Sequence, residues 1–125
     1  MTGVQTCALP ILDLPEMPVD PVFAQTLGLL VHELLTNSIK YGALKVANGC
    51  VTFSALRAVS NNGRSVKFEW RETGGSSPIP PRHKGFGHQM LLMAVKQKGG
   101  TVQFNWRPQG LVCEIEIPED NLGRL

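Results

Sequence analysis

The sequence predicts an α+β domain, a two-layer sandwich in which both helices cover one face of a mainly antiparallel sheet. Two observations indicate this class. The expected elements follow in the order helix, two strands, loop, helix, two strands, and turn signals join the strands of each pair into a hairpin. With 125 residues, 42% of them hydrophobic, the chain can bury one core of ordinary size. We therefore expect a single domain.

The first helix is expected to follow Asp20. Aspartate is a common N-cap, and Pro21 suits the first helical position because its missing N–H is not needed there. Apolar residues then recur at intervals of three and four from Phe23 to Ile39, which is the helical period. Gly42 is expected to end this helix.

Two strands are expected next, at 50–59 and 64–72. Asn61, Asn62 and Gly63 lie between them and form a strong hairpin signal, so the two strands should pair antiparallel. The segment that follows, 73–87, is rich in Gly, Ser and Pro and is expected to be a loop.

The second helix is expected over 86–98, where apolar residues resume the helical period and Gly99 and Gly100 end it. A second hairpin should follow, with strands at 101–107 and 111–117 around a Pro-Gln-Gly turn.

The two ends of the chain are expected to lie outside the domain. Residues 1–11, MTGVQTCALPI, resemble the in-frame translation of a sequencing-library adapter, so they are not expected to belong to the fold. A genuine N-terminal tail is the alternative. Residues 12–19 are then a residual upstream segment, and the natural protein should continue upstream of Leu12. We expect the domain at 20–118 and a frayed tail at 119–125.

Composition excludes several classes of protein. The net charge of +2 is too small to argue for a nucleic-acid partner or an anionic membrane surface. No apolar run approaches the roughly 20 residues of a membrane span. Three cysteines without CxxC spacing and the absence of a signal peptide favour a reducing, cytoplasmic setting. Cys50 and Cys113 fall within expected strands and should be small buried hydrophobes.

A polar stripe runs along the first helix. Glu33, Asn37, Lys40 and Tyr41 follow one another at spacings of four, three and one, which places an acid, an amide, a cation and a phenol along one side. The acid and the amide, one turn apart, could orient a water and ligate Mg²⁺, which prefers oxygen ligands and bridges to phosphates. A solvated helix face with an internal ion pair explains the same pattern.

A carboxylate is expected at the end of the second strand. Phe68, Trp70 and Glu72 alternate onto one face, and Gly74 and Gly75 follow directly. Glu72 could accept a hydrogen bond from a ligand's amino group in a partly apolar pocket, while the glycines let backbone approach the ligand. An exposed acid followed by a turn is the ordinary alternative.

The second helix begins at a glycine pair. Gly85 and Gly87 lie where unpaired N–H groups and the helix dipole favour anions, and Arg82 and Lys84 lie just upstream. This suits a polyphosphate, although an ordinary loop-to-helix entry would read the same. Walker A and Rossmann spacings are absent, as are HExxH and GxSxG motifs, which leaves those enzyme classes without support.

These signals occur together in an order that resembles a known family. HELLTNSIKYGAL is similar to the N box of the GHKL ATPase superfamily, and WRETGG followed by KGFG is similar to its two glycine boxes. His32 and the W-x-E motif at Trp70 and Glu72 resemble the HWE group of bacterial sensor histidine kinases, in which Glu replaces the Asp of the first glycine box. The resemblance covers Asp20 to Pro118 and implies a Bergerat-type ATP-binding fold.

The resemblance implies roles on the phosphate side of an ATP site. Asn37 would ligate Mg²⁺, Glu33 would act catalytically by polarising the attacking group or a metal-bound water, and Lys40 would contact phosphate oxygens. Gly85 and Gly87 would let the lid backbone cradle the phosphates. The chemistry would then be positioning plus charge neutralisation.

On the adenine side, the resemblance implies that Glu72 accepts a hydrogen bond from the amino group, that Gly74 lets the base approach, and that Tyr41 lines the pocket. The chain departs from the family pattern in its short lid between Gly75 and Gly85 and in Leu111, where many relatives have Thr.

The function implied is that of a protein-histidine kinase domain, which transfers the γ-phosphoryl group of Mg-ATP to a histidine on a dimerisation domain. Residues 12–19 are too short for a phosphoacceptor helix, so the fragment should lack the acceptor histidine. A response regulator would be the further partner. The alternative is a non-catalytic nucleotide-binding regulator built on the same fold, similar to an anti-sigma factor.

Overall fold

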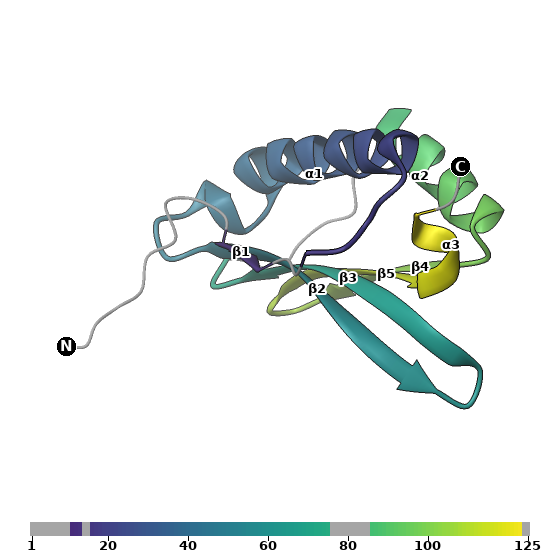
Figure 1. The fold of residues 1–125 in the computed structure, drawn as a ribbon. Helices are drawn as coiled ribbons and strands as arrows, with labels where there is room; N and C mark the ends of the chain where they lie inside the picture. Colours follow the sequence, from purple (N-terminus) through teal and green to yellow (C-terminus); the bar gives the residue numbers. More distant parts are fainter. Residues whose placement is uncertain (1–10, 14–15, 76–85, 124–125) are drawn as a thin grey trace.

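A computed structural model describes residues 11–13, 16–75 and 86–123 of the chain. Figure 1 shows a layer of helices over one face of a sheet. The elements in chain order are β1 (Ile11–Asp13), α1 (Pro21–Tyr41), the 3-10 helix η1 (Ala43–Lys45), β2 (Cys50–Ser60), β3 (Gly63–Thr73), α2 (Phe86–Gln97), β4 (Thr101–Arg107), β5 (Gly110–Pro118) and α3 (Glu119–Leu122).

Within the described residues, five strands form one sheet in the order β1-β2-β3-β5-β4. All neighbouring strands pair antiparallel except β1 and β2, which are parallel. Helices α1 and α2 both lie on the same face of the sheet (Figure 1). The α+β sandwich predicted from the sequence is therefore confirmed.

The core lies between the two layers. Strand β3 alternates along its inner face, so that every second residue is buried from Val66 to Glu72. Helix α1 turns its apolar stripe toward this face, because residues three and four apart lie on one side of a helix. The largest fully buried side chains include Phe23, Leu30, Val66, Trp70, Leu91, Val95, Ile115 and Ile117.

The elements expected from the sequence are present with ends that differ by at most one residue. Asp20 is the N-cap of α1, with its Oδ1 accepting a hydrogen bond from the N–H of Val22 at 2.8 Å, and Gly42 is the C-cap residue. Among the described residues, no helix is both long and apolar enough to cross a membrane.

Two segments differ from the expectation. Strand β1 lies at 11–13 and pairs with β2, although its first residue, Ile11, falls in the segment that resembles a translated adapter. The expectation of a frayed tail is wrong for 119–122, because Leu122 is buried in the core and its carbonyl accepts a hydrogen bond from the N–H of Asp20 at 3.0 Å. Helix α3 has only four residues, too few to show a helical period in the sequence.

The two strand cysteines also differ from each other. Cys113 is buried, and burial raises the pKa of its thiol to about 12, so it is the small apolar side chain that was expected. The same expectation is wrong for Cys50, which is only half-buried. The alternation of β2 explains the difference in burial, because its fully buried residues begin at Val51, on the opposite face from Cys50.

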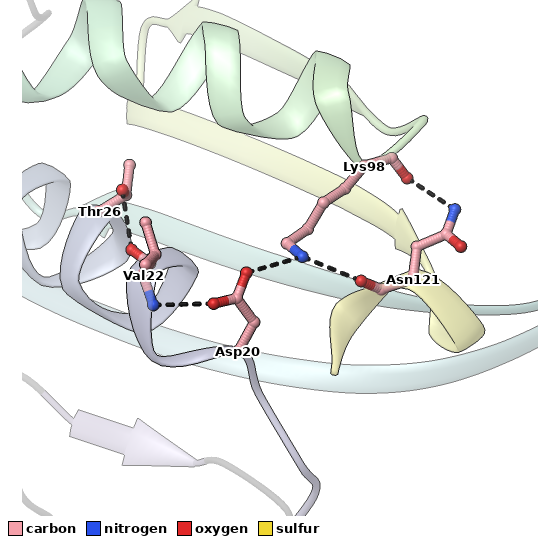
Figure 2. Close-up of polar contacts among 5 residues, drawn as sticks. All are labelled: Asp20, Val22, Thr26, Lys98 and Asn121. Carbon is pink, nitrogen blue, oxygen red and sulfur yellow. Dashed lines mark hydrogen bonds and ion pairs between the residues drawn. The ribbon is translucent and has the colours of Figure 1, made fainter. Parts of the chain in front are cut away.

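A buried ion pair fastens the beginning of α1 to the end of α2 (Figure 2). The Nζ of Lys98 lies 2.9 Å from the Oδ2 of Asp20 and donates to the carbonyl oxygen of Asn121 at 3.0 Å. The side-chain amide of Asn121 donates in return to the carbonyl oxygen of Lys98 at 2.9 Å. Three helices that are distant in sequence therefore meet at this cluster, which we call the Asp20–Lys98 clamp and define as Asp20, Lys98 and Asn121.

The clamp should make stability depend on pH. The hydrogen bond from Lys98 lowers the pKa of Asp20 from its ordinary 3.8. A lowered folded-state pKa contributes stability above the unfolded-state value, and this contribution is lost as pH falls through the lowered value. Asp20→Asn should therefore lower the free energy of unfolding at neutral pH, and the difference from the parent should shrink in acid.

Urea unfolding at neutral pH and at a pH below 3.8 measures this difference. The control is Asp120→Asn, which removes an exposed aspartate from α3. Equal losses of stability at both pH values for Asp20→Asn would show that the ion pair is not responsible.

Candidate functional site

The centre of the candidate site is Glu72, next to last in β3. Its side chain points to the helix-facing side of the sheet and is only 4% exposed. A carboxylate removed from water to this degree is costly unless donors surround it. The neighbouring groups supply these donors.

Three donors meet the two carboxylate oxygens of Glu72. Its Oε1 accepts hydrogen bonds from the Oγ of Ser38 at 2.9 Å and from the backbone N–H of Ala43 at 3.0 Å. Its Oε2 accepts one from the indole Nε1 of Trp70 at 2.9 Å. The carboxylate thus joins the end of β3 to the last turn of α1 and to the start of η1. We call Ser38, Ala43, Trp70 and Glu72 the Glu72 network.

Glycines make room for this network. A Cβ on Gly42 would lie 2.4 Å from the Oε1 of Glu72, and one on Gly110 would lie 2.0 Å from its backbone oxygen. Gly42 has φ of −119°, which other residues adopt freely, so here a glycine is needed for space. Gly42 therefore both ends α1, as expected, and admits the carboxylate.

The polar stripe of α1 begins beside this network. Asn37 directly precedes Ser38 and is half-buried, and within the described ranges its side chain makes no hydrogen bond. Glu33 lies one turn earlier, and its Oε2 accepts a hydrogen bond from the backbone N–H of His88 at 3.3 Å, in the first turn of α2. The acid and the amide of the stripe thus lie between the Glu72 network and the beginning of α2.

The remaining predicted residues are placed differently. Lys40 is exposed at the end of α1, and Tyr41 is 60% exposed. Gly74 has φ of +81°, and a Cβ there would lie 2.3 Å from the backbone oxygen of Asn48, so it needs glycine for its conformation and for space. Gly87 lies in the first turn of α2. Gly85 and the lid from 76 to 85 fall outside the described residues.

Sequence reasoning did not identify Ser38, Ala43 and Trp70 as partners of Glu72. Two signals were present in the chain. Ser38 continues the stripe of Leu30 and Leu34 at intervals of four, so a polar side chain falls at a buried helical position. Trp70 shares a strand face with Glu72, and a buried indole N–H normally has an acceptor. For the backbone N–H of Ala43 the sequence carried no signal.

The donor set of the stripe fits a hard cation. Mg²⁺ takes oxygen ligands, keeps several waters and is usually held by one or two protein groups together with substrate phosphates. The amide oxygen of Asn37 and the nearby carboxylate of Glu33 have this chemistry. Over the part of the chain that the structure describes, His, Cys, Asp and Glu form no group of three that could hold a metal by themselves. A cation here would therefore depend on ligands from a bound phosphate.

Comparison with curated proteins finds several blue-light-activated histidine kinases among the relatives of this chain. A blue-light-activated histidine kinase of Brucella anthropi is 33% identical over 105 residues, which cover 83% of this chain and 21% of the relative. One from Rhizobium johnstonii is 34% identical over 105 residues, covering 83% of this chain and 30% of the relative. The chain thus spans less than a third of the length of these relatives. No protein-family model matches the chain.

Solved structures share the fold at lower identity. The histidine kinase domain of a blue-light activated histidine kinase from Erythrobacter litoralis superposes with a TM-score of 0.68 at 21% identity, over 91% of this chain and 52% of that one. The catalytic domain of the histidine kinase ThkA superposes with a TM-score of 0.58 at 18% identity, over 88% of this chain and 78% of that one.

Removing the carboxylate of Glu72 should lower the stability of the protein even without a bound ligand. Glu72→Ala leaves the buried N–H groups of Trp70 and Ala43 without an acceptor, and each unsatisfied buried group costs about 1–3 kcal/mol. We expect the free energy of unfolding to fall by about 2–6 kcal/mol, measured by urea denaturation.

The matched control is Glu69→Ala on the same strand. Glu69 pairs with Arg71 at 2.9 Å on the more open face of the sheet, and such pairs contribute about 0–1 kcal/mol. Equal losses for the two variants would show that the Glu72 network does not stabilise the fold.

Proposed function

We propose that this chain, a homologue of the blue-light-activated histidine kinases, is the ATP-binding domain of a sensor histidine kinase. It also has the fold of histidine kinase catalytic domains. In this proposal the domain is of the HWE group and acts on Mg-ATP. The γ-phosphoryl group leaves the β-phosphate oxygen, which remains on ADP, and bonds to an imidazole nitrogen of a histidine.

The observation that carries the proposal is the hydrogen bond between Ser38 and Glu72, at 2.9 Å. Ser38 directly follows Asn37, so this contact ties the carboxylate at the end of a central strand to the helical turn that carries the amide of the polar stripe. The group proposed to read a base and the group proposed to ligate a phosphate-bound cation thereby lie on two elements that are hydrogen-bonded to each other. Asn37 and Glu72 are the two residues on which the proposal depends most.

On the adenine side, Glu72 would accept a hydrogen bond from the exocyclic amino group. Its carboxylate offers acceptors only, whereas a 6-carbonyl base would present another acceptor to it. Gly74 and Tyr41 would lie along the base, in agreement with the position of Gly74 immediately after β3.

On the phosphate side, Asn37 would hold Mg²⁺ together with the phosphate oxygens. Glu33 would polarise the attacking group or a metal-bound water, Lys40 would contact phosphate oxygens, and Gly85 and Gly87 would let the backbone approach the phosphates. Phosphoryl transfer requires mainly positioning and charge neutralisation, and this set of residues can supply both.

The acceptor histidine would lie on a dimerisation domain, and a response regulator would receive the phosphoryl group afterwards. We place this activity in the cytoplasm, with no role for nucleic acid and no membrane contact by this segment. Residues 1–11 remain, in this proposal, a translated adapter, and 12–19 the end of an upstream segment.

Nucleotide titration by calorimetry tests the site. Asn37→Ala should keep much of the affinity for ATP but remove its dependence on Mg²⁺, because the base contact stays and the metal ligand is lost. Glu72→Gln should lower the affinity at least about tenfold, since a charge-assisted hydrogen bond is worth 1.5 kcal/mol or more.

Gln25→Ala is the matched control for Asn37→Ala, because it removes an exposed amide from the same helix. Thermal unfolding of each variant confirms that the protein being titrated is folded. Parent-like affinity and parent-like Mg²⁺ dependence in both site variants would refute the proposal.

The upstream reading frame separates the kinase from a non-catalytic regulator. In an uncut copy of the gene, we expect the frame before Leu12 to encode a helical hairpin with a histidine on an exposed face. Sequencing that region is the measurement. A native start codon close to Leu12 would instead favour the regulator.

A further inference from the structure

The indole of Trp70 and the carboxylate of Glu72 form a pair within one strand. Residues two apart on a strand point to the same face, and these two side chains are 1% and 4% exposed. The Nε1 of Trp70 lies 2.9 Å from the Oε2 of Glu72. An indole N–H is a donor only, so its hydrogen bond requires an acceptor such as this oxygen.

The carboxylate of Glu72 has more acceptor positions than its described protein donors use. A carboxylate has about four lone-pair positions, two on each oxygen. Among the residues that the structure describes, Oε1 accepts from Ser38 and from Ala43, whereas Oε2 accepts only from Trp70. The open acceptor position is thus on Oε2, the oxygen that the indole contacts.

Without Trp70, the two donors to Oε1 would hold one end of the carboxylate. The other oxygen could still turn about that end, because the terminal torsion of a glutamate side chain is broad. The indole N–H removes this freedom and aims the remaining lone pair of Oε2. A ligand's donor gains most from a protein acceptor whose lone pair already points toward it, because that acceptor loses no freedom when the hydrogen bond forms.

We infer that Trp70 is a positioning residue for base recognition, because its N–H orients Glu72 so that Oε2 can accept the 6-amino group of adenine. The inference rests on the proposed role of Glu72. Burial in the core explains a large apolar ring at position 70 but not an N–H donor. The inference gives a role to that donor.

The test compares two nucleotides that differ only in the amino group, ATP and purine riboside triphosphate, which lacks it. The ratio of their affinities, measured by calorimetry on the 125-residue chain, reports the amino contact alone. Trp70→Phe keeps an aromatic ring and removes the N–H. We expect it to lower the preference for ATP by about threefold to tenfold, as expected for a weakened hydrogen bond.

Phe68→Leu is the matched control, because it removes ring volume from the same face of β3, two residues earlier, without touching a polar atom. It should lower stability and leave the preference for ATP unchanged. A purely structural role of Trp70 would weaken both nucleotides equally, and a parent-like preference in Trp70→Phe overturns the inference.

Failure of the inference can be told apart from failure of the proposed function. If the parent prefers ATP and Glu72→Gln removes that preference, while Trp70→Phe keeps it, Glu72 reads the base and Trp70 does not position it. If the parent has no preference for ATP, the role of Glu72 itself is wrong and the inference falls with it.

A second variant covers a folding failure of Trp70→Phe. In a Trp106→Phe background, the one remaining tryptophan can be replaced by benzothienylalanine, which keeps the two-ring shape and has sulfur in place of the N–H. The same loss of preference is expected. The unsubstituted Trp106→Phe protein also leaves Trp70 as the sole tryptophan, so its fluorescence should respond to ATP more than to the analogue, and an equal response contradicts the inference.

Discussion

A buried carboxylate at the end of a central strand is the constraint around which this corner of the fold is built. Glu72 is tolerable there only because three donors reach it, and those donors come from different elements. Ser38 must lie on the sheet-facing side of α1, α1 must end at Gly42 so that the N–H of Ala43 turns inward, and Trp70 must occupy the same strand face. The end of α1 and the inner face of β3 are therefore arranged so that the buried carboxylate of Glu72 has hydrogen-bond donors.

The Asp20–Lys98 clamp plays a comparable part at the opposite end of α1. Asp20 caps the helix and pairs with Lys98 at the end of α2, while Glu72 holds the last turn through Ser38. Helix α2 is contacted at its first turn by Glu33 and at its end by the clamp. Both helices therefore have polar attachments at each end, and the stripe that carries Asn37 lies along a helix whose position is fixed.

The elements that the sequence predicted well are those with a local chemical signal. Asp20 followed by proline, the Asn-Asn-Gly turn and the period of three and four in α1 each act within a few residues, and each appears in the structure. Helix α3 and the Glu72 network were not predicted, because they depend on contacts between distant segments. The hydrogen bond from Ser38 to Glu72 joins residues 34 positions apart, and that from Ala43 joins residues 29 apart.

The length of the residue at position 72 connects these observations. Aspartate would set the carboxylate back by one C–C bond, about 1.5 Å, toward the strand. From there it could not reach both the hydroxyl on α1 and the N–H of η1 while keeping the indole bond, so at least one buried donor would lose its acceptor. The longer side chain in turn requires Gly42, where a Cβ would lie 2.4 Å from Oε1. Trp70, Glu72, Ser38 and Gly42 therefore form one interdependent set, in which a change at any member alters the conditions for the others.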